Sequence, residues 1–238
     1  MVSGLQLSSS SLSRTTNNER LWLDWIAQQD DPLPALRVFS ENYHYFSLHQ
    51  AVAFSRLFQV VAAHDRESLV LLADMLYQEL GQGDQNRAHS IIFEQFAKAV
   101  GVDITRLPLS PDKVVEGVRW YVCELEKGFG GSLPCALATY QFVEGSGVET
   151  YGPLLSILRS FGLSEEALEF FTLHAEVEIE HTQVAAKIVQ RARAAFSAEE
   201  SQAFDVQKTV LQKAWEQFWK DIFTVCKQET SVLTLSNR

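Results

Sequence analysis

Apolar residues recur every three or four positions along most of the chain. This spacing is typical of α-helices that bury one face, whereas β-strands alternate apolar and polar positions. The 12 glycines and 6 prolines are few for a chain of this length. No internal repeat and no linker divides the chain, so we predict an all-α fold, a single bundle of about seven or eight helices. The predicted helices cover residues 19–28, 34–63, 66–80, 85–100, 111–127, 134–161, 164–196 and 197–227.

Short polar motifs mark where several of these helices begin and end. Ser110 precedes Pro111, and proline is favoured at the first helical position because its missing N–H costs nothing there. Ser164 can cap the helix that follows it, whose first turn carries two glutamates. Residues 81–84, Gly-Gln-Gly-Asp, are predicted to form a loop. We expect a flexible N-terminal tail over residues 1–17, a domain over 18–230 and a C-terminal tail over 231–238.

Composition and charge narrow the class of protein. With 46% hydrophobic residues, a chain of 238 residues can bury a full core, which excludes intrinsic disorder. The net charge of −10 has the wrong sign for neutralising phosphates, so we expect no nucleic-acid partner. The apolar runs are far shorter than the ~20 residues that span a bilayer, so we expect no membrane partner. Cys123, Cys135 and Cys226 lack metal-site or redox spacing and are expected to be reduced thiols of a cytoplasmic protein.

The strongest chemical signal lies within the predicted helix over 164–196. At about 100° per residue, Glu178 lies ~40° from His174 around the helix axis, and His181 lies ~20° to the other side. Two imidazoles and a carboxylate therefore share one stripe, and this ligand mix suits iron or manganese. Glu176 and Glu180 fall on the opposite face, where solvation is expected. A purely polar helix surface would produce the same pattern, so the stripe alone leaves both interpretations open.

Acids and a histidine in other unusual places favour the metal site. Glu79 ends one apolar helix, His89 begins the next, and Glu144 ends an otherwise apolar segment. A carboxylate on an apolar face costs free energy unless it is paired or bound to a metal. Together with the stripe, these residues make three carboxylates and three histidines from three regions of a helical bundle. This is the ligand count of a two-iron site in a bundle core.

The order and spacing of these residues resemble the motif set of the heme-oxygenase-like diiron oxidases and oxygenases. The motif set is Glu79 followed by Gly-x-Gly and His89, then an isolated Glu144, then His174-x3-Glu178-x2-His181. The resemblance covers about residues 34–228 and implies a seven-helix bundle that holds two iron ions and uses O2 as co-substrate, with an external electron donor. It implies one iron on Glu79, His89 and Glu178 in some combination, and the other on His174 and His181, with Glu144 bridging or chelating. Many members have aspartate where this chain has Glu178.

Overall length and ligand register make the chain most similar to the cyanobacterial nitrile-forming branch of this family. That resemblance implies oxidative cleavage of an amino-acid side chain, converting a halogenated L-tryptophan to an indole-3-carbonitrile in natural-product biosynthesis. Phe142, Tyr151, Phe170 and Phe171 could flank an indole, although core packing is the commoner explanation for each of them. Arg191 could bind the carboxylate of the amino-acid substrate.

Several alternatives stay open at this point. Another diiron oxidase of the same fold could hydroxylate an amine or carry out a desaturation that cleaves a C–C bond, and a non-redox binding module would need no iron. A ferritin-like bundle would need a second Glu-x-x-His pair, and Glu41-x-x-His44 comes too early in the chain to fit that order. A homodimer fits as well, because an aromatic C-terminal helix suits either a core or a dimer surface. Its aromatic residues are Trp215, Phe218, Trp219 and Phe223.

Overall fold

The computed structural model describes residues 16–147 and 149–236. Within these residues the chain forms nine α-helices, two short 3₁₀ helices and no strand, so the predicted all-α class is confirmed. The α-helices are α1 (Asn17–Ile26), α2 (Leu33–Ala62), α3 (Arg66–Glu79), α4 (His89–Ala99), α5 (Glu116–Phe129), α6 (Leu133–Ser146), α7 (Tyr151–Ser160), α8 (Glu169–Arg193) and α9 (Ala198–Ser236). The 3₁₀ helices are η1 (Gln85–Arg87) and η2 (Ile104–Arg106). The predicted N-terminal tail lies, over residues 1–15, outside the described residues.

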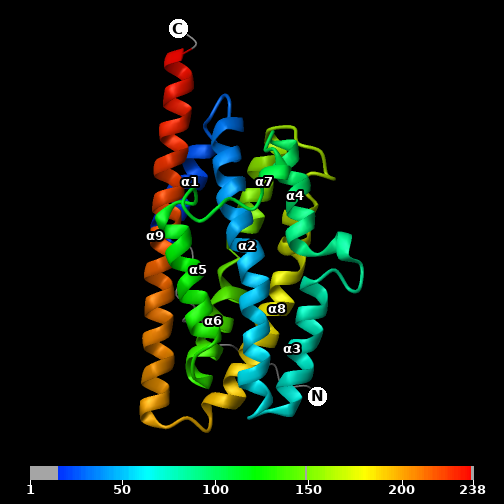
Figure 1. Cartoon of the computed structure of the whole chain (residues 1–238), viewed down its shortest axis with the longest axis vertical. Helices are drawn as coiled ribbons and strands as arrows, with labels where there is room; N and C mark the ends of the chain where they lie inside the picture. The colour runs from blue at the N-terminus through cyan, green and yellow to red at the C-terminus, as the bar shows by residue number, and fades with distance from the viewer. Residues whose placement is uncertain (1–15, 148, 237–238) are drawn as a thin grey trace, which may run out of the picture.

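The helices pack as one bundle around two long helices (Figure 1). α9 runs along one side and packs against α1, α2, α5 and α6. α2 lies in the centre and also contacts α3 and α4, which follow one another along the opposite side. α8 packs against α3, α4, α6 and α7. The loop between α3 and α4 protrudes from the bundle, so the end of α3 and the start of α4 meet beside α8.

Aromatic side chains form much of the core between α1, α2 and α9. Trp22, Phe39 and Trp219 are almost completely buried, and their ring centroids lie 4.9–6.0 Å apart. Trp215 and Phe218 extend this cluster along α9. Aromatic pairs at this spacing add about 0.5–1.5 kcal/mol each beyond the burial of their surface. The aromatic stripe of α9 therefore packs into the core of its own chain.

The predicted helix over 134–161 is wrong in one respect, because the chain breaks it into α6 and α7. The break lies between Gly147 and Tyr151. A Cβ atom on Gly147 would lie 2.4 Å from the ring of Tyr151 and 2.7 Å from Oε1 of Glu178, so a larger residue here would displace one or both side chains. The backbone N–H groups of Thr150 and Tyr151 both donate to the carbonyl oxygen of Gly147 and close the turn.

Two predicted helix starts are too early. The chain only turns over residues 111–113, and α5 begins at Glu116. The hydroxyl of Ser164 accepts a hydrogen bond from the N–H of Ala167 at 3.2 Å, as a cap should, but α8 begins only at Glu169. A proline or a capping hydroxyl can start a single turn as well as a long helix, so these motifs could not fix the boundary.

The C-terminal helix is longer than the sequence pattern predicts. α9 extends to Ser236, so the backbone of residues 231–236, predicted to be a tail, is helical. Cys123, Cys135 and Cys226 are free thiols, and Cys226 is buried in the core. No helix in the described part of the chain is long and apolar enough to cross a membrane.

Replacing Gly117 with alanine should destabilise the protein. Gly117 lies where α5 approaches α9, and a Cβ atom there would lie 2.5 Å from the carbonyl oxygen of Gln217. Alanine favours a helix over glycine by about 1 kcal/mol, but the overpacking costs about 1–3 kcal/mol or more because rigid backbone is in the way. We therefore expect a net loss of stability in urea unfolding. Gly152→Ala is the matched control, because no atom lies within 4 Å of a Cβ there. Equal stability of the two variants would contradict the close approach of α5 and α9.

Candidate metal centre

Glu79 and His89 are brought together by the loop between α3 and α4. Glu79 is the last residue of α3, and His89 is the first residue of α4. Gly81 and Gly83 have φ angles of +82° and +93°, in the left-handed region that glycine adopts at little cost. The predicted helix over 85–100 accordingly divides into η1 and α4. Oε2 of Glu79 lies 3.0 Å from Nδ1 of His89.

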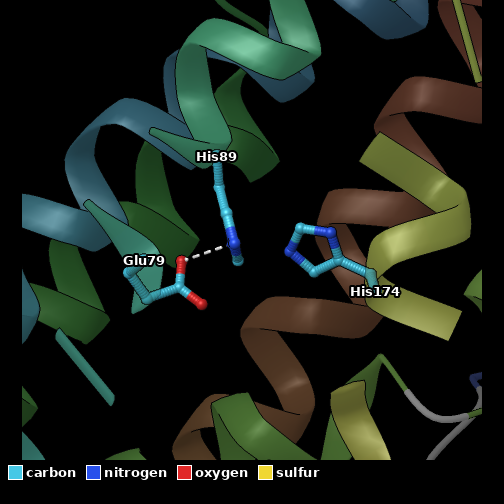
Figure 2. A group of neighbouring side chains, drawn as sticks. All are labelled: Glu79, His89 and His174. Atoms are coloured by element: carbon cyan, nitrogen blue, oxygen red, sulfur yellow. Dashed lines mark ion pairs between the residues drawn. The ribbon is translucent and has the colours of Figure 1, made fainter. Parts of the chain in front are cut away.

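His174 of α8 completes a first group of ligands. The potential ligand atoms of Glu79, His89 and His174 all lie within 4.8 Å of one another, and Figure 2 shows the three side chains converging from different helices. Nδ1–H of His174 donates to the carbonyl oxygen of Phe170 at 2.7 Å. This hydrogen bond leaves the lone pair on Nε2, as in metal-binding histidines whose other nitrogen is held by a carbonyl. His174 therefore presents a ligand nitrogen to the group.

Glu144 and His181 form a second group. Nδ1 of His181 lies 3.4 Å from Oε2 of Glu144. On the other side of the ring, Nε2 of His181 lies 3.2 Å from the amide oxygen of Gln78. Because an amide oxygen only accepts, Nε2 carries the proton and Nδ1 the lone pair. Gln78 could not be predicted from the sequence, because an isolated glutamine in the last turn of a helix carries no recognisable signal.

Glu178 lies between the two groups. It is 7% exposed and lines the same cavity as Glu79, Glu144 and His174. Its Oε2 atom is buried and has no hydrogen-bond partner. Burial, together with the charges of Glu144 and Glu79, raises the pKa of the Glu178 carboxyl well above its ordinary value. All six predicted ligands thus lie close together, grouped as Glu79, His89 and His174 against Glu144 and His181, which differs from the grouping that the resemblance implies.

The protonation of the other ligands follows from their burial and their neighbours. Burial lowers the pKa of His174 to about 4, and the nearby His89 contributes in the same direction, so His174 is neutral at neutral pH. Burial raises the pKa of Glu144 against the opposing effect of His181. Burial also disfavours the charged form of Glu79, but His89 and its other histidine neighbours outweigh this effect and hold the pKa of Glu79 below its ordinary value. The centre therefore holds buried acids that bound cations would stabilise in their ionised form.

The donor set fits metal ions without any change of residue. Two atoms bound to one ion at ~2.1 Å lie about 3.0 Å apart when the bonds are perpendicular, and Glu79 and His89 have this separation. Nδ1 of His89 is buried and close to Glu79 but has no hydrogen-bond partner, and neither has the buried Oε2 of Glu178. Such atoms are costly unless something binds them. Three carboxylates and three imidazoles suit iron or manganese.

The sequence also matches a known protein family. Residues 36–215, about three quarters of the chain, match the family described as iron-containing redox enzymes. The chain belongs to this family. All six candidate ligands of this iron-containing redox enzyme fall within the matched residues. No curated protein shows significant sequence similarity to the chain.

Solved structures confirm the heme-oxygenase-like fold. A domain of unknown function with this fold from Shewanella denitrificans OS217 superposes with a TM-score of 0.71 at 13% identity, over 93% of this chain and 89% of that chain. A CADD-like protein of unknown function from Nostoc punctiforme PCC 73102 gives a TM-score of 0.71 at 14% identity, over 93% of this chain and 94% of that chain. At such low identity these likenesses concern the fold alone.

A small cavity lies beside the candidate metal ligands of this iron-containing redox enzyme. Its volume is about 30 Å³, close to the share of one molecule in liquid water. Besides four of the ligands, its lining residues are Tyr43, Phe46, Gln50, Val143, Ser146, Gly147, Thr150, Tyr151, Trp215 and Trp219. No lysine or arginine is among these described residues. A substrate as large as an indole therefore requires side chains or helices to move.

The aromatic residues predicted to flank a substrate have different locations. Tyr151 lines the cavity, where its hydroxyl lies 2.5 Å from that of Tyr43. The ring of Phe170 lies 4.0 Å from that of His174 but does not line the cavity. Phe142 and Phe171 are buried in the core. The other walls of the cavity come from α2, from the end of α6 and the break that follows it, and from α9.

Arg191 lies far from the metal ligands. It follows His181 on α8 by ten residues, about 15 Å along a helix. Its guanidinium contacts Glu67 at 2.6 Å and Asp65 at 3.6 Å, and it lines a separate cleft of about 410 Å³ beside the end of α2 and the start of α3. The structure therefore corrects the prediction that Arg191 binds a substrate carboxylate beside the centre, because two acids already hold it elsewhere.

Proposed function

We propose that this iron-containing redox enzyme is a non-heme diiron oxygenase. The two iron ions would be held by Glu79, His89, Glu144, His174, Glu178 and His181. The observation that carries the proposal is the convergence of six donors from α3, α4, α6 and α8. Five of these residues are buried and Glu79 is partly buried, and two of the donor atoms, Nδ1 of His89 and Oε2 of Glu178, have no hydrogen-bond partner. When bound, a pair of ferrous ions supplies electrons for the reductive activation of O2. An external electron donor would then restore the ferrous state.

The residues around the ligands would prepare the centre for this chemistry. Phe170 and Gln78 fix the tautomers of His174 and His181, so each presents a lone pair without rearrangement. Aromatic residues form much of the cavity wall, and exclusion of bulk water by these residues would strengthen every electrostatic interaction inside it. A surface cleft of about 290 Å³ that is lined by Gln78 and His89 reaches the other side of the centre and offers a route for metal and O2.

For the substrate, we propose an amino acid whose side chain is cleaved oxidatively, with halogenated L-tryptophan giving an indole-3-carbonitrile. The support is the resemblance of the ligand register together with the aromatic character of the cavity, in which Trp215, Phe46 and Tyr43 could stack on an indole. Since the described residues that line the cavity include no lysine or arginine, the substrate carboxylate would have to meet neutral donors or the metal centre itself. Substrate entry would also have to enlarge the cavity.

Anaerobic titration of the metal-free protein with Fe(II), followed by rapid mixing with O2, tests this proposal. We expect uptake of two ions per chain, and a transient visible absorption that forms faster with the correct amino acid present. L-Tryptophan and its halogenated analogues are compared, and products are identified by mass spectrometry. A nitrile product supports the tryptophan reaction, whereas a hydroxylated amine or an alkene assigns another diiron oxidation. Absence of iron uptake would contradict the metal centre and leave the fold as a binding module.

A further inference from the structure

A buried acid of α1 reaches the wall of the cavity from outside the matched region. Glu19 is completely buried and is not one of the candidate ligands. Its carboxylate accepts a hydrogen bond from the N–H of Thr16 at 3.2 Å and makes a short hydrogen bond to the hydroxyl of Thr150. Thr150 lines the cavity together with His174 and Glu178. A single side chain, that of Thr150, therefore connects Glu19 to the cavity.

Counting protons at Thr150 indicates that Glu19 carries one. The hydroxyl of Thr150 has a single proton, yet it contacts two acceptors, Oε1 of Glu19 and the carbonyl oxygen of Ser146 at 3.1 Å. A protonated Glu19 satisfies both contacts, because it donates to Thr150 while Thr150 donates to Ser146. An ionised Glu19 would force Thr150 to share its single proton between the two acceptors, which is the weaker arrangement.

The surroundings of Glu19 agree with this proton. Burial raises the pKa of the Glu19 carboxyl to about 7, against the opposing effect of its contacts with Thr150 and Thr16, while Glu149 raises it slightly further. The other titratable groups that face it are Tyr43 and Tyr121, both neutral near pH 7 because burial raises their pKa values. The largest effects on its pKa come from burial and from Thr150, Thr16, Trp215 and Glu149, none of which is a cation.

We propose that Glu19 and Thr150 form a proton relay that supplies the cavity during turnover, an inference that rests on the proposed oxygenase function. In this relay the hydroxyl of Thr150 turns from Ser146 toward a basic atom in the cavity and gives up its proton. The proton of Glu19 forms the new O–H bond of Thr150, and Glu19 becomes a carboxylate that water later reprotonates. Reduction of O2 consumes protons, and the relay would deliver them to the cavity. Glu19 acts through Thr150 and does not itself touch the reacting atoms.

The alternative role for Glu19 is structural, because it also completes the cap of α1 with Thr16 and joins α1 to Thr150. Glu19→Gln separates the two roles. A glutamine amide can accept from Thr16 and donate to Thr150, so it keeps the hydrogen bonds of a protonated glutamate but cannot release a proton. Thr150→Val removes the relay hydroxyl at nearly constant volume, and Thr150→Ser retains it. Glu41→Gln is a matched control on α2, since burial raises the pKa of Glu41 too.

The first measurement uses metal-free protein and needs no activity. Infrared difference spectra across pH 5 to 9 should contain the C=O band of a protonated carboxylic acid that disappears near pH 7 in the wild type and in Glu41→Gln. The same band should be missing in Glu19→Gln. If the spectra of the wild type and Glu19→Gln are identical, Glu19 holds no proton to relay and the proposal is overturned.

The second measurement uses the iron-loaded protein. General acids contribute about 10²–10⁴-fold to a rate, so Glu19→Gln and Thr150→Val should lower kcat at least ~10-fold with little change in KM. The dependence of kcat on a group that titrates near pH 7 should vanish in Glu19→Gln and persist in Thr150→Ser. If no amino acid is turned over, the oxidation rate of bound Fe(II) by O2 replaces kcat. Equal rates and pH profiles in all variants would overturn the relay, whereas a wild type that binds no iron would contradict the diiron proposal itself, with the infrared band unaffected.

Discussion

Replacing Glu178 with alanine should weaken iron binding by at least about 100-fold and abolish O2 consumption, because loss of an outer partner of a metal ligand alone costs about 10–100-fold. Glu178 lies between the two groups of ligands, and its buried Oε2 has no partner within the described protein. Its pKa is raised well above the ordinary value, first by burial and then by Glu144 and Glu79, so without metal it holds a proton. Metal binding would replace that proton with a cation.

Glu176→Ala is the matched control for this experiment. Glu176 lies two residues away on α8 and is exposed, as the helical pattern predicts. Iron content after gel filtration, isothermal titration with Fe(II) and O2 uptake are measured for both variants. Glu176→Ala should match the wild type in all three. If Glu178→Ala still binds two ions with unchanged affinity, Glu178 is only a buried acid and the centre must be rebuilt from the other five residues.

The helices could be predicted from the sequence because apolar residues at helical spacing report directly which face is buried. The break at Gly147 could not, since glycine is tolerated inside helices and its role here depends on contacts with Tyr151 and Glu178 from other helices. For the same reason the starts of α5 and α8 were placed too early. A local motif predicts that a turn begins, whereas the length of a helix is decided by what it packs against.

For the candidate ligands, too, the sequence predicts what is local to one helix but not how different helices meet. His174, Glu178 and His181 could be placed on one stripe because helix geometry fixes their angles. Which group each joins depends on how α3, α4 and α6 meet α8, and the resemblance implied a different partition from the one that the distances favour. Arg191 lies on the same helix as the ligands, but ten residues beyond His181 correspond to about 15 Å along the axis, too far for it to reach the centre. Gln78 carries no sequence signal, and the Thr16-x-x-Glu19 pattern indicates only a helix start. The contacts that make these two residues important are with partners over 100 residues away.

Replacing Glu19 with glutamine should make the metal-free protein more stable at pH 8 by about 3 kcal/mol, and should change its stability little at pH 4.5. The pKa of Glu19 is raised from 4.5 to about 7 on folding, chiefly by burial. The stabilisation that the protonated acid gives is therefore complete below pH 4.5 and is lost as pH rises through 7. A shift of this size corresponds to about 3 kcal/mol, since one pKa unit is about 1.4 kcal/mol.

The difference between the two proteins isolates this effect from the other groups. His174 has its pKa lowered to about 4, chiefly by burial, so it destabilises the folded state as pH falls below 6.5, and it does so equally in both proteins. Urea unfolding of the wild type and Glu19→Gln at pH 4.5, 6 and 8 gives the difference at each pH. A glutamine variant that is less stable than the wild type at pH 8 would mean that Glu19 joins α1 to Thr150 as a carboxylate. In that case the acid could not act as a proton donor, because its charged form would be the one that the fold stabilises.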